Sequence, residues 1–358
     1  MLAASSASTL QRILSAGILA PSADNRHLFR FSILTDRVVM KPDDLFRSAD
    51  AQTRLLACIS FGATVENIAL EATCVGYSAD IDWLLTEDAL CEIRLVASDD
   101  PPDRLAQAIS LRHTNRRFFS GPPLAPAEKT DLEREVSRVP QAHVTWLDQP
   151  AERRTALRLI RLAETERFRS RALHAELFSG LRFDMPPNSN CEQGIPIGAA
   201  EIDIFARPFF RLMRHWSVMR LLNVARAHSL IGLRAAYFPA RLSPHLGVIS
   251  AGGEIPEAAI SAGRAFERFW LRATQLGMVL QPFAAAPLYA RPEFKGVSFD
   301  TRAALQSGWT ELQPHGMPLI AFRLGHAAVP SAVTGRPPLS HFLTTEPIVS
   351  GQTRTDRP

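Results

Sequence analysis

A short basic segment in the first third of the chain has residue types and a spacing suited to holding an anion. The segment reads Arg112-His113-Thr114-Asn115-Arg116. In an extended chain alternate residues point to the same side, so Arg112, Thr114 and Arg116 would face one partner. Two guanidinium groups flanking a hydroxyl can hold a phosphate dianion, or the O2/N1 edge of a flavin that gains negative charge on reduction. A solvated basic loop is the alternative for this segment taken alone.

A second polar segment occupies a turn near the N-terminus. It begins at Pro21, which ends a helix predicted over residues 8–20, and reads PSADN at 21–25. The Ser22 hydroxyl and the Asn25 amide can hydrogen-bond the polar edge of a planar ring. An Asx-type turn, in which these side chains bond only nearby backbone, is the alternative.

Motifs for other chemistries are missing from the sequence. It holds no GxGxxG after a predicted strand, no Walker loop, no HExxH and no GxSxG. The four cysteines form no CxxC pair, and no Cys/His set has zinc spacing, so we expect no metal. Because acidic residues and histidines show no obvious triad, a cofactor with its own reactivity is favoured over side-chain catalysis.

Hydrophobic patterns predict the helices and strands that would position these segments. Strands are expected at 29–34, 37–40, 91–97, 143–147, 278–283 and 318–324. Helices are expected at 8–20, 60–75, 103–112, 151–179 and 201–230, with loops at 181–200 and 328–338. The mixture predicts an α+β fold.

Two of the predicted helices allow more than one interpretation. Residues 151–179 interleave arginines with glutamates, which suits a solvated face with ion pairs; phosphate binding is the alternative. Residues 201–230 include Met213, Trp216 and Met219, which suit a core or lid helix. A helix lying on a membrane surface is the alternative there.

An internal repeat with an offset of 201 residues relates two parts of the chain. The pattern SxGxxxExxxLxATxxG occurs at 60–76 and again at 261–277. We interpret it as one helix used twice, N-capped by Ser60 and Ser261 and ended by a left-handed glycine. Two unrelated amphipathic helices are the alternative. A duplication would let one chain imitate a homodimer.

Several of these segments resemble segments of the nitroreductase superfamily. APSADNRHLF at 20–29 looks like the APSxxNxQPW segment of that family, and residues 112–116 resemble its arginine–serine–arginine FMN motif. The other similar segments are its core helices, at 59–76 and 261–283, and its C-terminal phosphate-contacting basic segment, at 335–338. The order of the segments is most similar to the Acg-type tandem branch, over about residues 8–342.

The resemblance implies a nitroreductase-like, FMN-binding α+β fold with two related halves fused as a pseudo-dimer. A partial first half would span 1–103 and a second half 104–345, with a lid insert around 181–250 and a polar tail at 346–358. In dimeric members one subunit gives the arginines and the other the PSxxN turn. The repeat offset places a second such turn at 222–226, where the sequence reads LNVAR. We therefore expect one complete site and one lost site per chain.

The same resemblance implies the site residues one by one. Contact with the phosphate or the pyrimidine edge is expected from Arg112, Arg116 and Arg336, and hydrogen bonds to the flavin from Thr114, Ser22 and Asn25, with Pro21 beside them. The loop at 193–198, with the backbone of Gly194 and Ile195, resembles the family's segment near flavin N5, and a plain loop is the alternative. No side chain is assigned a catalytic role, because flavin N5 carries the chemistry. The usual Gln-Pro-Trp reads His27-Leu28-Phe29 here, so the part played by His27 stays open.

Three functions are compatible with this sequence. The first is an FMN-dependent oxidoreductase that moves hydride from NADH or NADPH to a nitro compound, a quinone or a similar small-molecule acceptor. The second is a non-enzymatic FMN-binding or FMN-sequestering protein whose insert blocks the flavin. The third is a helical interaction protein with a basic surface.

Composition sets the remaining expectations. Hydrophobic residues make up 46% of the chain, which suits a sizeable core, and 40 basic against 36 acidic residues is too balanced to indicate nucleic acid. We see no signal peptide and no apolar run of the ~20 residues that span a bilayer. We expect a cytoplasmic protein without nucleic-acid or membrane partners, and a monomer because a pseudo-dimer has less need to self-associate.

Overall fold

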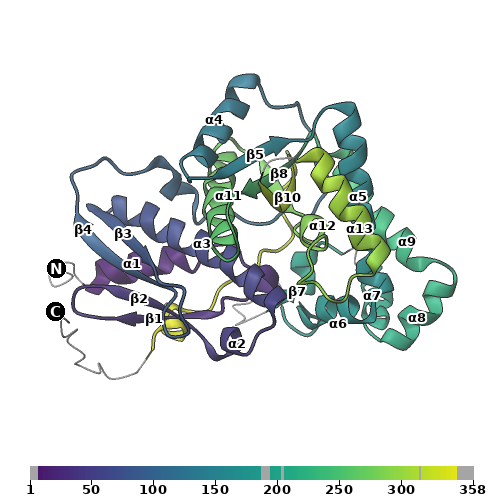
Figure 1. The fold of residues 1–358 in the computed structure, drawn as a ribbon, viewed down its shortest axis with the longest axis horizontal. Helices are drawn as coiled ribbons and strands as arrows, with labels where there is room; N and C mark the ends of the chain where they lie inside the picture. Colours follow the sequence, from purple (N-terminus) through teal and green to yellow (C-terminus); the bar gives the residue numbers. More distant parts are fainter. Residues whose placement is uncertain (1–6, 187–193, 203–204, 314–315, 345–358) are drawn as a thin grey trace, which may run out of the picture.

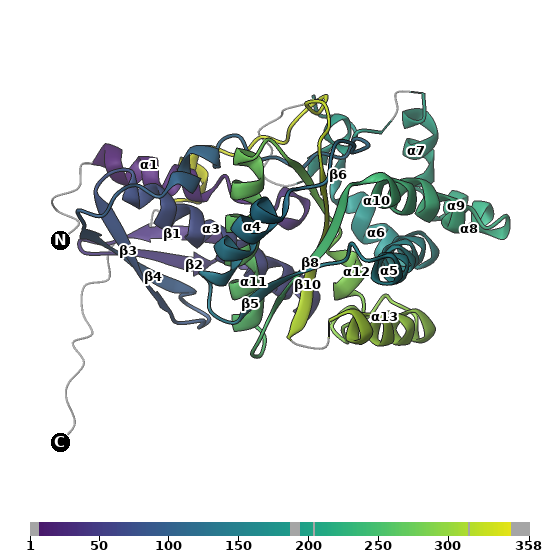
Figure 2. The ribbon, with the colours of Figure 1, turned by 90° about the horizontal axis from the view of Figure 1, so that it is seen from above.

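Two four-stranded antiparallel sheets flank a central pair of long helices (Figures 1 and 2). The computed structural model describes residues 7–186, 194–202, 205–313 and 316–344. Helices and sheets are both abundant in these ranges, which confirms the predicted α+β class.

The first sheet has the strand order β1-β2-β4-β3. Its strands are β1 (Phe29–Ile33), β2 (Val38–Pro42), β3 (Tyr77–Trp83) and β4 (Cys91–Ala97). Its helices are α1 (Ala7–Gly17), α2 (Asp44–Arg47) and α3 (Ala51–Thr73). The core between them is made of apolar side chains from α1, α3 and the sheet, among them Ile13, Phe29, Phe31, Phe61 and Val65.

The second sheet repeats this plan, with the order β5-β8-β10-β9. Its strands are β5 (Ala142–Trp146), β8 (His245–Ala251), β9 (Val279–Pro282) and β10 (Met317–Gly325), and its central helix is α11 (Glu257–Gln275). In each sheet the long helix follows the second strand, the third strand in chain order lies at an edge, and the fourth inserts between the second and third. The expected pair of related halves is confirmed.

Further helices surround the second sheet (Figure 2). They are α4 (Pro126–Ser137), α5 (Pro150–Arg169), α6 (Arg171–Ser179), α12 (Ala285–Leu288) and α13 (Phe299–Leu312). An outer group lies at the end of the molecule farthest from the first sheet (Figure 1). Its helices are α7 (Arg207–Met213), α8 (Trp216–Val224) and α9 (Ala227–Gly232), followed by a π-helical turn over 233–237 and α10 (Phe238–Leu242).

The two repeat helices cross at glycines that occupy equivalent places. A Cβ atom on Gly62 of α3 would lie 2.1 Å from the carbonyl oxygen of Ile260, and one on Gly263 of α11 would lie 1.9 Å from that of Ile59. Gly62 and Gly263 are 201 positions apart, and so are Ile59 and Ile260. The repeated glycines therefore mark the place where the backbones of the two equivalent helices are in direct contact.

The predicted N-caps of these helices are wrong. Helix α3 begins at Ala51, where the Asp50 carboxylate accepts a hydrogen bond of 2.8 Å from the Thr53 N–H, and α11 begins at Glu257. Ser60 lies inside α3 and donates to the Leu56 carbonyl at 3.1 Å. The apolar pattern continues upstream of the serine, so the helix runs on to the next good cap. The predicted left-handed glycines are confirmed, with φ of +79° at Gly76 and +72° at Gly277.

Other differences from the sequence prediction involve short or buried elements. The expected helix at 103–112 is a single 3₁₀ turn at 104–108, and 151–179 is divided into α5 and α6 at Ser170. Residues 201–230 form short helices rather than one. Strand β3 was not predicted, and all of β8 except its last residue falls in the stretch expected to be an insert at 181–250. Every residue of β8 is buried, so its sequence lacks the alternation that marks a half-exposed strand.

The C-terminal segment returns to the first half. The 3₁₀ turn at Leu339–Phe342 packs against α1 and β1, with the Phe342 ring centroid 5.6 Å from that of Phe29 (Figure 1). Leu343 forms a bridge to Phe31. This end of the expected second half, 104–345, therefore belongs to the first core. The expected polar tail at 346–358 lies outside the described residues.

Within the part of the chain that the structure describes, one helix is long and apolar enough to cross a membrane by length and composition alone. It is α3, and 78% of its most apolar window is buried within the structure. Its apolar side chains are those that join the first sheet to α11, as expected of a core helix.

We predict that Gly263→Ala destabilises the protein by about 3 kcal/mol or more, because the new methyl group would overlap the Ile59 carbonyl. Urea denaturation followed by circular dichroism measures the free energy of unfolding. Gly252→Ala is the matched control: its Cβ would have its nearest neighbour at 3.5 Å, and we expect a change below about 1 kcal/mol. Equal effects of the two substitutions would contradict the assigned crossing.

Candidate functional site

A cavity of about 440 Å³ lies between the two halves of the chain. Its wall combines the 21–25 turn, the inner faces of α3 and α11, the 109–116 segment and the 332–336 loop. All the residues predicted to bind a cofactor line this cavity except Gly194: they are Pro21, Ser22, Asn25, Arg112, Thr114, Arg116, Ile195 and Arg336. Residues as much as 315 positions apart in sequence are thus neighbours in space.

The basic segment enters the cavity as an extended chain. The Asn115 N–H donates to the Leu280 carbonyl at 3.1 Å, and Thr114 forms a bridge beside β9. The Asn115 side chain is buried and donates to the Ala328 carbonyl at 2.9 Å. Because alternate side chains of an extended chain face opposite ways, Arg112, Thr114 and Arg116 reach the cavity together. His113 also contributes to the wall.

Arg112 is held from three sides. Its Nη2 donates to the Leu19 carbonyl at 2.8 Å, its Nε lies 3.3 Å from Oε1 of Glu267, and its Cζ lies 4.5 Å from the Trp270 ring centroid. The side chain is only 4% exposed. Burial lowers the pKa of the Arg112 guanidinium, and the Glu267 charge opposes that shift.

Glu267 is a site residue that sequence reasoning missed. It is fully buried on α11, and neither carboxylate oxygen has a hydrogen bond of good geometry among the described residues. Burial raises the pKa of Glu267 to about 7, while the Arg112 charge acts to lower it. The signal was present in the sequence, because Glu267 is the glutamate of the second repeat copy, but nothing there showed that Arg112 would be its neighbour.

Arg336 joins the C-terminal loop to the 21–25 turn. Its Nε donates to the Ile18 carbonyl at 3.1 Å, its Nη2 to the Ala20 carbonyl at 3.0 Å and its Nη1 to Oδ1 of Asn25 at 2.5 Å. Asn25 in turn donates from Nδ2 to the Gly335 carbonyl at 3.3 Å. Asn25 has a left-handed φ of +56°, which asparagine tolerates better than most residues. The Asn25 amide therefore positions the arginine loop at the cavity wall.

Ser22 presents a hydroxyl to the cavity. Its Oγ is buried and has no hydrogen-bond partner among the described residues. Buried hydroxyls are rarely left in that condition. The neighbouring His27 is by contrast a structural residue: it contacts the Ile18 carbonyl through Nε2 at 3.1 Å, and its ring makes a tilted contact with Phe29 and an edge-on contact with Phe342. Burial lowers the pKa of His27 to about 3, so the ring is neutral.

The expectation for the 193–198 loop needs a correction. The Gly194 N–H donates to the Asp24 carbonyl at 2.7 Å, and the Ile195 N–H donates to the Gly180 carbonyl at 2.7 Å. Both backbone donors expected to point at a ring are therefore engaged within the protein, which ties the loop to the 21–25 turn and to the end of α6. Gln193 lies outside the described residues.

A second cavity of about 500 Å³ adjoins the first. The two share Asp24, Thr114 and Arg116, and the second continues between α5, α12 and the inner side of α7, α9 and α10. Most of its wall is apolar. Arg167 of the predicted arginine-rich helix is among its polar residues, with Nη1 3.1 Å from Glu164 Oε2 and Nε 3.3 Å from the Tyr289 hydroxyl. That arginine is thus not on a solvated face.

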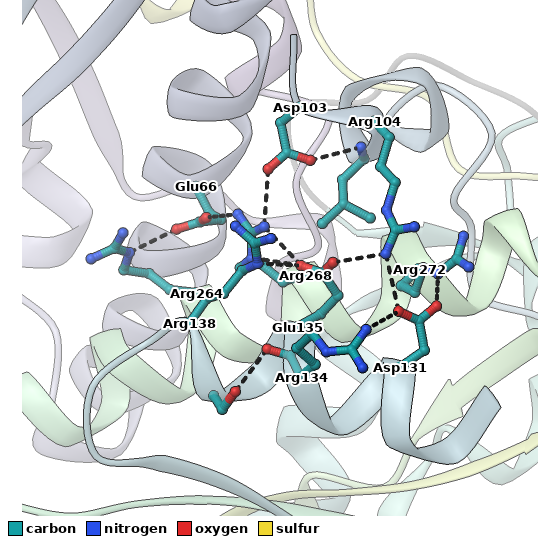
Figure 3. Close-up of polar contacts among 12 residues, drawn as sticks. Glu66, Asp103, Arg104, Asp131, Arg134, Glu135, Arg138, Arg264, Arg268 and Arg272 are labelled. Atoms are coloured by element: carbon teal, nitrogen blue, oxygen red, sulfur yellow. Dashed lines mark hydrogen bonds and ion pairs between the residues drawn. The ribbon is translucent and has the colours of Figure 1, made fainter. Parts of the chain in front are cut away.

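The equivalent side of the helix pair is filled by ion pairs (Figure 3). Counting by the 201-residue offset, Arg264 and Arg268 stand where α3 has Ala63 and Asn67. Glu66, the partner of Glu267 in the repeat, accepts 2.8 Å and 2.7 Å hydrogen bonds from these two arginines.

Helix α4 covers this network. Its Glu135 is 2% exposed and pairs with Arg268 at 2.8 Å, while Asp103 pairs with the same guanidinium at 3.0 Å (Figure 3). The two copies of one helix therefore differ in their surroundings: one glutamate is neutralised by its neighbouring helix, and the other faces the cavity wall through Arg112.

Comparison with known proteins gives likeness only to solved structures. No protein-family model and no curated protein matches the sequence. A nitroreductase with bound FMN from Bacteroides fragilis aligns at 14% identity and a TM-score of 0.35, over 72% of this chain and 100% of that chain. The FMN-dependent nitroreductase NfnB from Mycobacterium smegmatis, in complex with NADPH, aligns at 18% identity and a TM-score of 0.34, over 71% of this chain and 100% of that chain. A nitroreductase with bound FMN from Desulfitobacterium hafniense aligns at 12% identity and a TM-score of 0.38, over 68% of this chain and 99% of that chain.

We predict that Glu267→Gln changes how stability depends on pH. Because the folded-state pKa of Glu267 is raised from 4.5 to about 7, between these values the folded protein keeps a proton that the unfolded chain has lost. The free energy of unfolding of the parent protein therefore falls as pH rises from 4.5 to about 7. The glutamine variant has no carboxyl group at this position, so its free energy of unfolding does not fall for this reason.

The variant should accordingly gain about 1–3 kcal/mol relative to the parent protein between pH 4.5 and 7. Urea denaturation at a series of pH values measures the difference. Glu311→Gln, which removes an exposed glutamate, is the matched control and should leave the profile unchanged. Parallel profiles for Glu267→Gln and the parent protein would contradict the assignment.

Proposed function

We propose that the protein binds one FMN between its halves and acts as an oxidoreductase of nitroreductase type. It would take hydride from NADH or NADPH and reduce a small-molecule acceptor such as a nitro compound or a quinone. The observation that carries the proposal is one cavity in which Arg112, Thr114 and Arg116 face Ser22 and the Arg336 loop. The order of these segments along the chain further supports a tandem nitroreductase with one complete site.

The residues present suit the cofactor. FMN joins a phosphate dianion to a planar ring, and the cavity joins Arg112, Arg116 and Arg336 to apolar walls that include Phe266 and Trp270. A volume of about 440 Å³ lies within the usual range for cofactor sites. The Ser22 hydroxyl, buried without a partner among the described residues, provides a hydrogen-bonding group at the same wall.

The chemistry divides between the cofactor and the chain. Bound FMN supplies a ring that accepts hydride and passes it, or electrons, to an acceptor. The chain binds and orients: Arg112 and Arg116 hold negative charge, Asn25 holds the Arg336 loop, and the apolar walls exclude water. Glu267 limits the positive charge that Arg112 presents, because the two groups lie 3.3 Å apart.

Sequestration of FMN is the second candidate. The observation that favours it is the set of helices α7, α9 and α10, whose inner side chains Phe210, Ile231 and Pro239 cover the adjoining cavity. A covered cavity would keep nicotinamide from the flavin. Since both candidates use one site between the halves of a single chain, we propose a monomer in either case, located in the cytoplasm where FMN and NAD(P)H occur.

We predict that Arg112→Ala weakens FMN binding by about 10- to 100-fold, through the loss of charge-assisted contacts worth ~1.5–3 kcal/mol. Quenching of flavin fluorescence on titration measures the affinity. Arg134→Ala, which removes an arginine 62% exposed on α4, is the control and should leave the affinity unchanged. The double variant Arg112→Gln/Glu267→Gln removes both buried charges, so neither is left without its partner if Arg112→Ala alone fails to fold. Normal FMN affinity in the double variant would contradict the placement of Arg112 at the FMN site.

We predict that the purified protein is yellow, and that adding NADH or NADPH without oxygen bleaches the flavin absorbance. Spectra recorded under anaerobic conditions make this measurement. A yellow protein that ignores both nucleotides, yet is bleached by dithionite, would favour sequestration over catalysis. A colourless protein that takes up no added FMN would contradict both candidates.

A further inference from the structure

The outer helices carry the basic excess of the whole chain. Between residues 205 and 253 there is no aspartate or glutamate, whereas the same stretch holds seven arginines: Arg207, Arg211, Arg214, Arg220, Arg226, Arg234 and Arg241. The chain has 40 basic and 36 acidic residues, so removing these seven would leave acidic residues in excess. None of the seven forms an ion pair with a carboxylate among the described residues.

The same helices expose large apolar side chains. Val224 is 83% exposed, Leu221 72% and Leu230 65%. Leu221 and Val224 are three apart on α8, so they share a face with the exposed Arg220. Arg226, which precedes α9, and Leu230 on α9 are both exposed, while Arg234 lies with its Cζ 5.0 Å from the Phe118 ring centroid and lines the second cavity. On α7, Phe209 and Leu212 are 52% and 51% exposed.

These exposed side chains are not needed for packing. The opposite side of the helices has its own apolar cluster, in which Met213 and Met219 pack on Phe168 of α5, with Trp216 and Ile231 beside them. The helices are therefore apolar on two sides, one turned to the core and one to solvent. A soluble protein rarely leaves such an apolar group uncovered without a partner.

The charge decides which partner fits. A second copy of the chain would bring seven more arginines against these seven, and like charges repel. An anionic bilayer surface attracts arginines and admits leucine, valine and phenylalanine side chains into the boundary between headgroups and acyl chains. Helices α7–α9 also stand at the end of the molecule opposite the first sheet, where a flat surface can reach them (Figures 1 and 2).

We propose that α7, α8 and α9 form a docking face for anionic lipid membranes. A helix lying on a membrane surface was the alternative interpretation of residues 201–230, although no membrane partner was expected for the protein. Docking of this kind is peripheral, and it is independent of whether FMN binds between the halves. It holds the protein by charge and by shallow insertion, so it weakens as salt screens the arginines.

Flotation of the full chain with vesicles tests the proposal. We expect binding to vesicles of equal parts phosphatidylcholine and phosphatidylglycerol, little binding to phosphatidylcholine alone, and weaker binding as sodium chloride rises. Arg220→Gln/Arg226→Gln should weaken partitioning by about tenfold or more. Leu221→Ser/Val224→Ser should weaken it as well, because shallow insertion is lost.

Matched controls come from β4 and from the α4 region, both away from the proposed docking face (Figures 1 and 2). Val96→Ser removes a side chain 53% exposed on β4, and Arg134→Gln/Arg138→Gln removes two exposed positive charges, one from α4 and one from the residue that follows it. Both should bind vesicles as the parent protein does. Thermal melting by circular dichroism confirms that every variant is folded.

Several results would overturn the proposal. Equal binding to charged and neutral vesicles would exclude a role for the arginines, and unchanged binding of both the arginine variant and the Leu221→Ser/Val224→Ser variant would place the contact elsewhere. Binding of poly-glutamate as tight as that of vesicles, insensitive to Leu221→Ser/Val224→Ser, would show a face that recognises acidic protein by charge alone. A dimer in sedimentation velocity that these variants disrupt would assign the face to self-association.

Discussion

The crossing of α3 and α11 is the constraint on which the rest of the structure depends. Gly62 and Gly263 allow each helix backbone to lie against a carbonyl of the other, so there is room for no side chain at either place. Close contact fixes the angle and the distance between the helices, and each helix carries its own sheet. Because these two glycines have no side chain, the helices can lie in direct contact, and that contact determines the positions of both sheets and of the cavity between them.

One duplicated helix has acquired two electrostatic surroundings. Glu66 is matched by arginines that α11 itself provides, and α4 completes the network with Glu135. Glu267 finds no such arginines on α3, where Ala63 and Asn67 occupy the equivalent places, and it meets Arg112 from a different segment instead. A buried charge needs a compensating charge. For Glu66 the compensating arginines belong to α11, and they fill one side of the helix pair. For Glu267 the compensating arginine belongs to the 112–116 segment, which lines a cavity on the other side.

The cavity wall is assembled by segments that cross between the halves. Residues 332–336 leave the second half, and Arg336 then bonds the carbonyls of Ile18 and Ala20 in the first. Arg112 bonds the Leu19 carbonyl between them. Three successive carbonyls after α1 are thus satisfied by two arginines, which holds the 21–25 turn and the basic segment in one wall. A site of this form belongs to neither half alone.

Local chemistry was readable from the sequence. Several predictions depend on residues close together in the chain. They are the alternation of Arg112, Thr114 and Arg116, the turn at 21–25, the strands at 29–34 and 37–40, and the glycines that end the repeat helices. The repeat itself indicated two related halves, because identical spacing of Ser, Gly and Glu is a property of the sequence. What the sequence hid were elements without periodicity, such as β8, whose two faces are both buried.

Only the tertiary structure decided which of these residues meet. That Glu267 neighbours Arg112, that the N–H groups of Gly194 and Ile195 are already bonded, and that Phe342 belongs to the first core depend on contacts between distant segments. The sequence determined the residue types and their local order, because propensity and spacing act over a few positions. The tertiary structure decided burial and pairing, since the pKa of a carboxylate or the availability of a donor depends on whichever atoms the folded chain places around it.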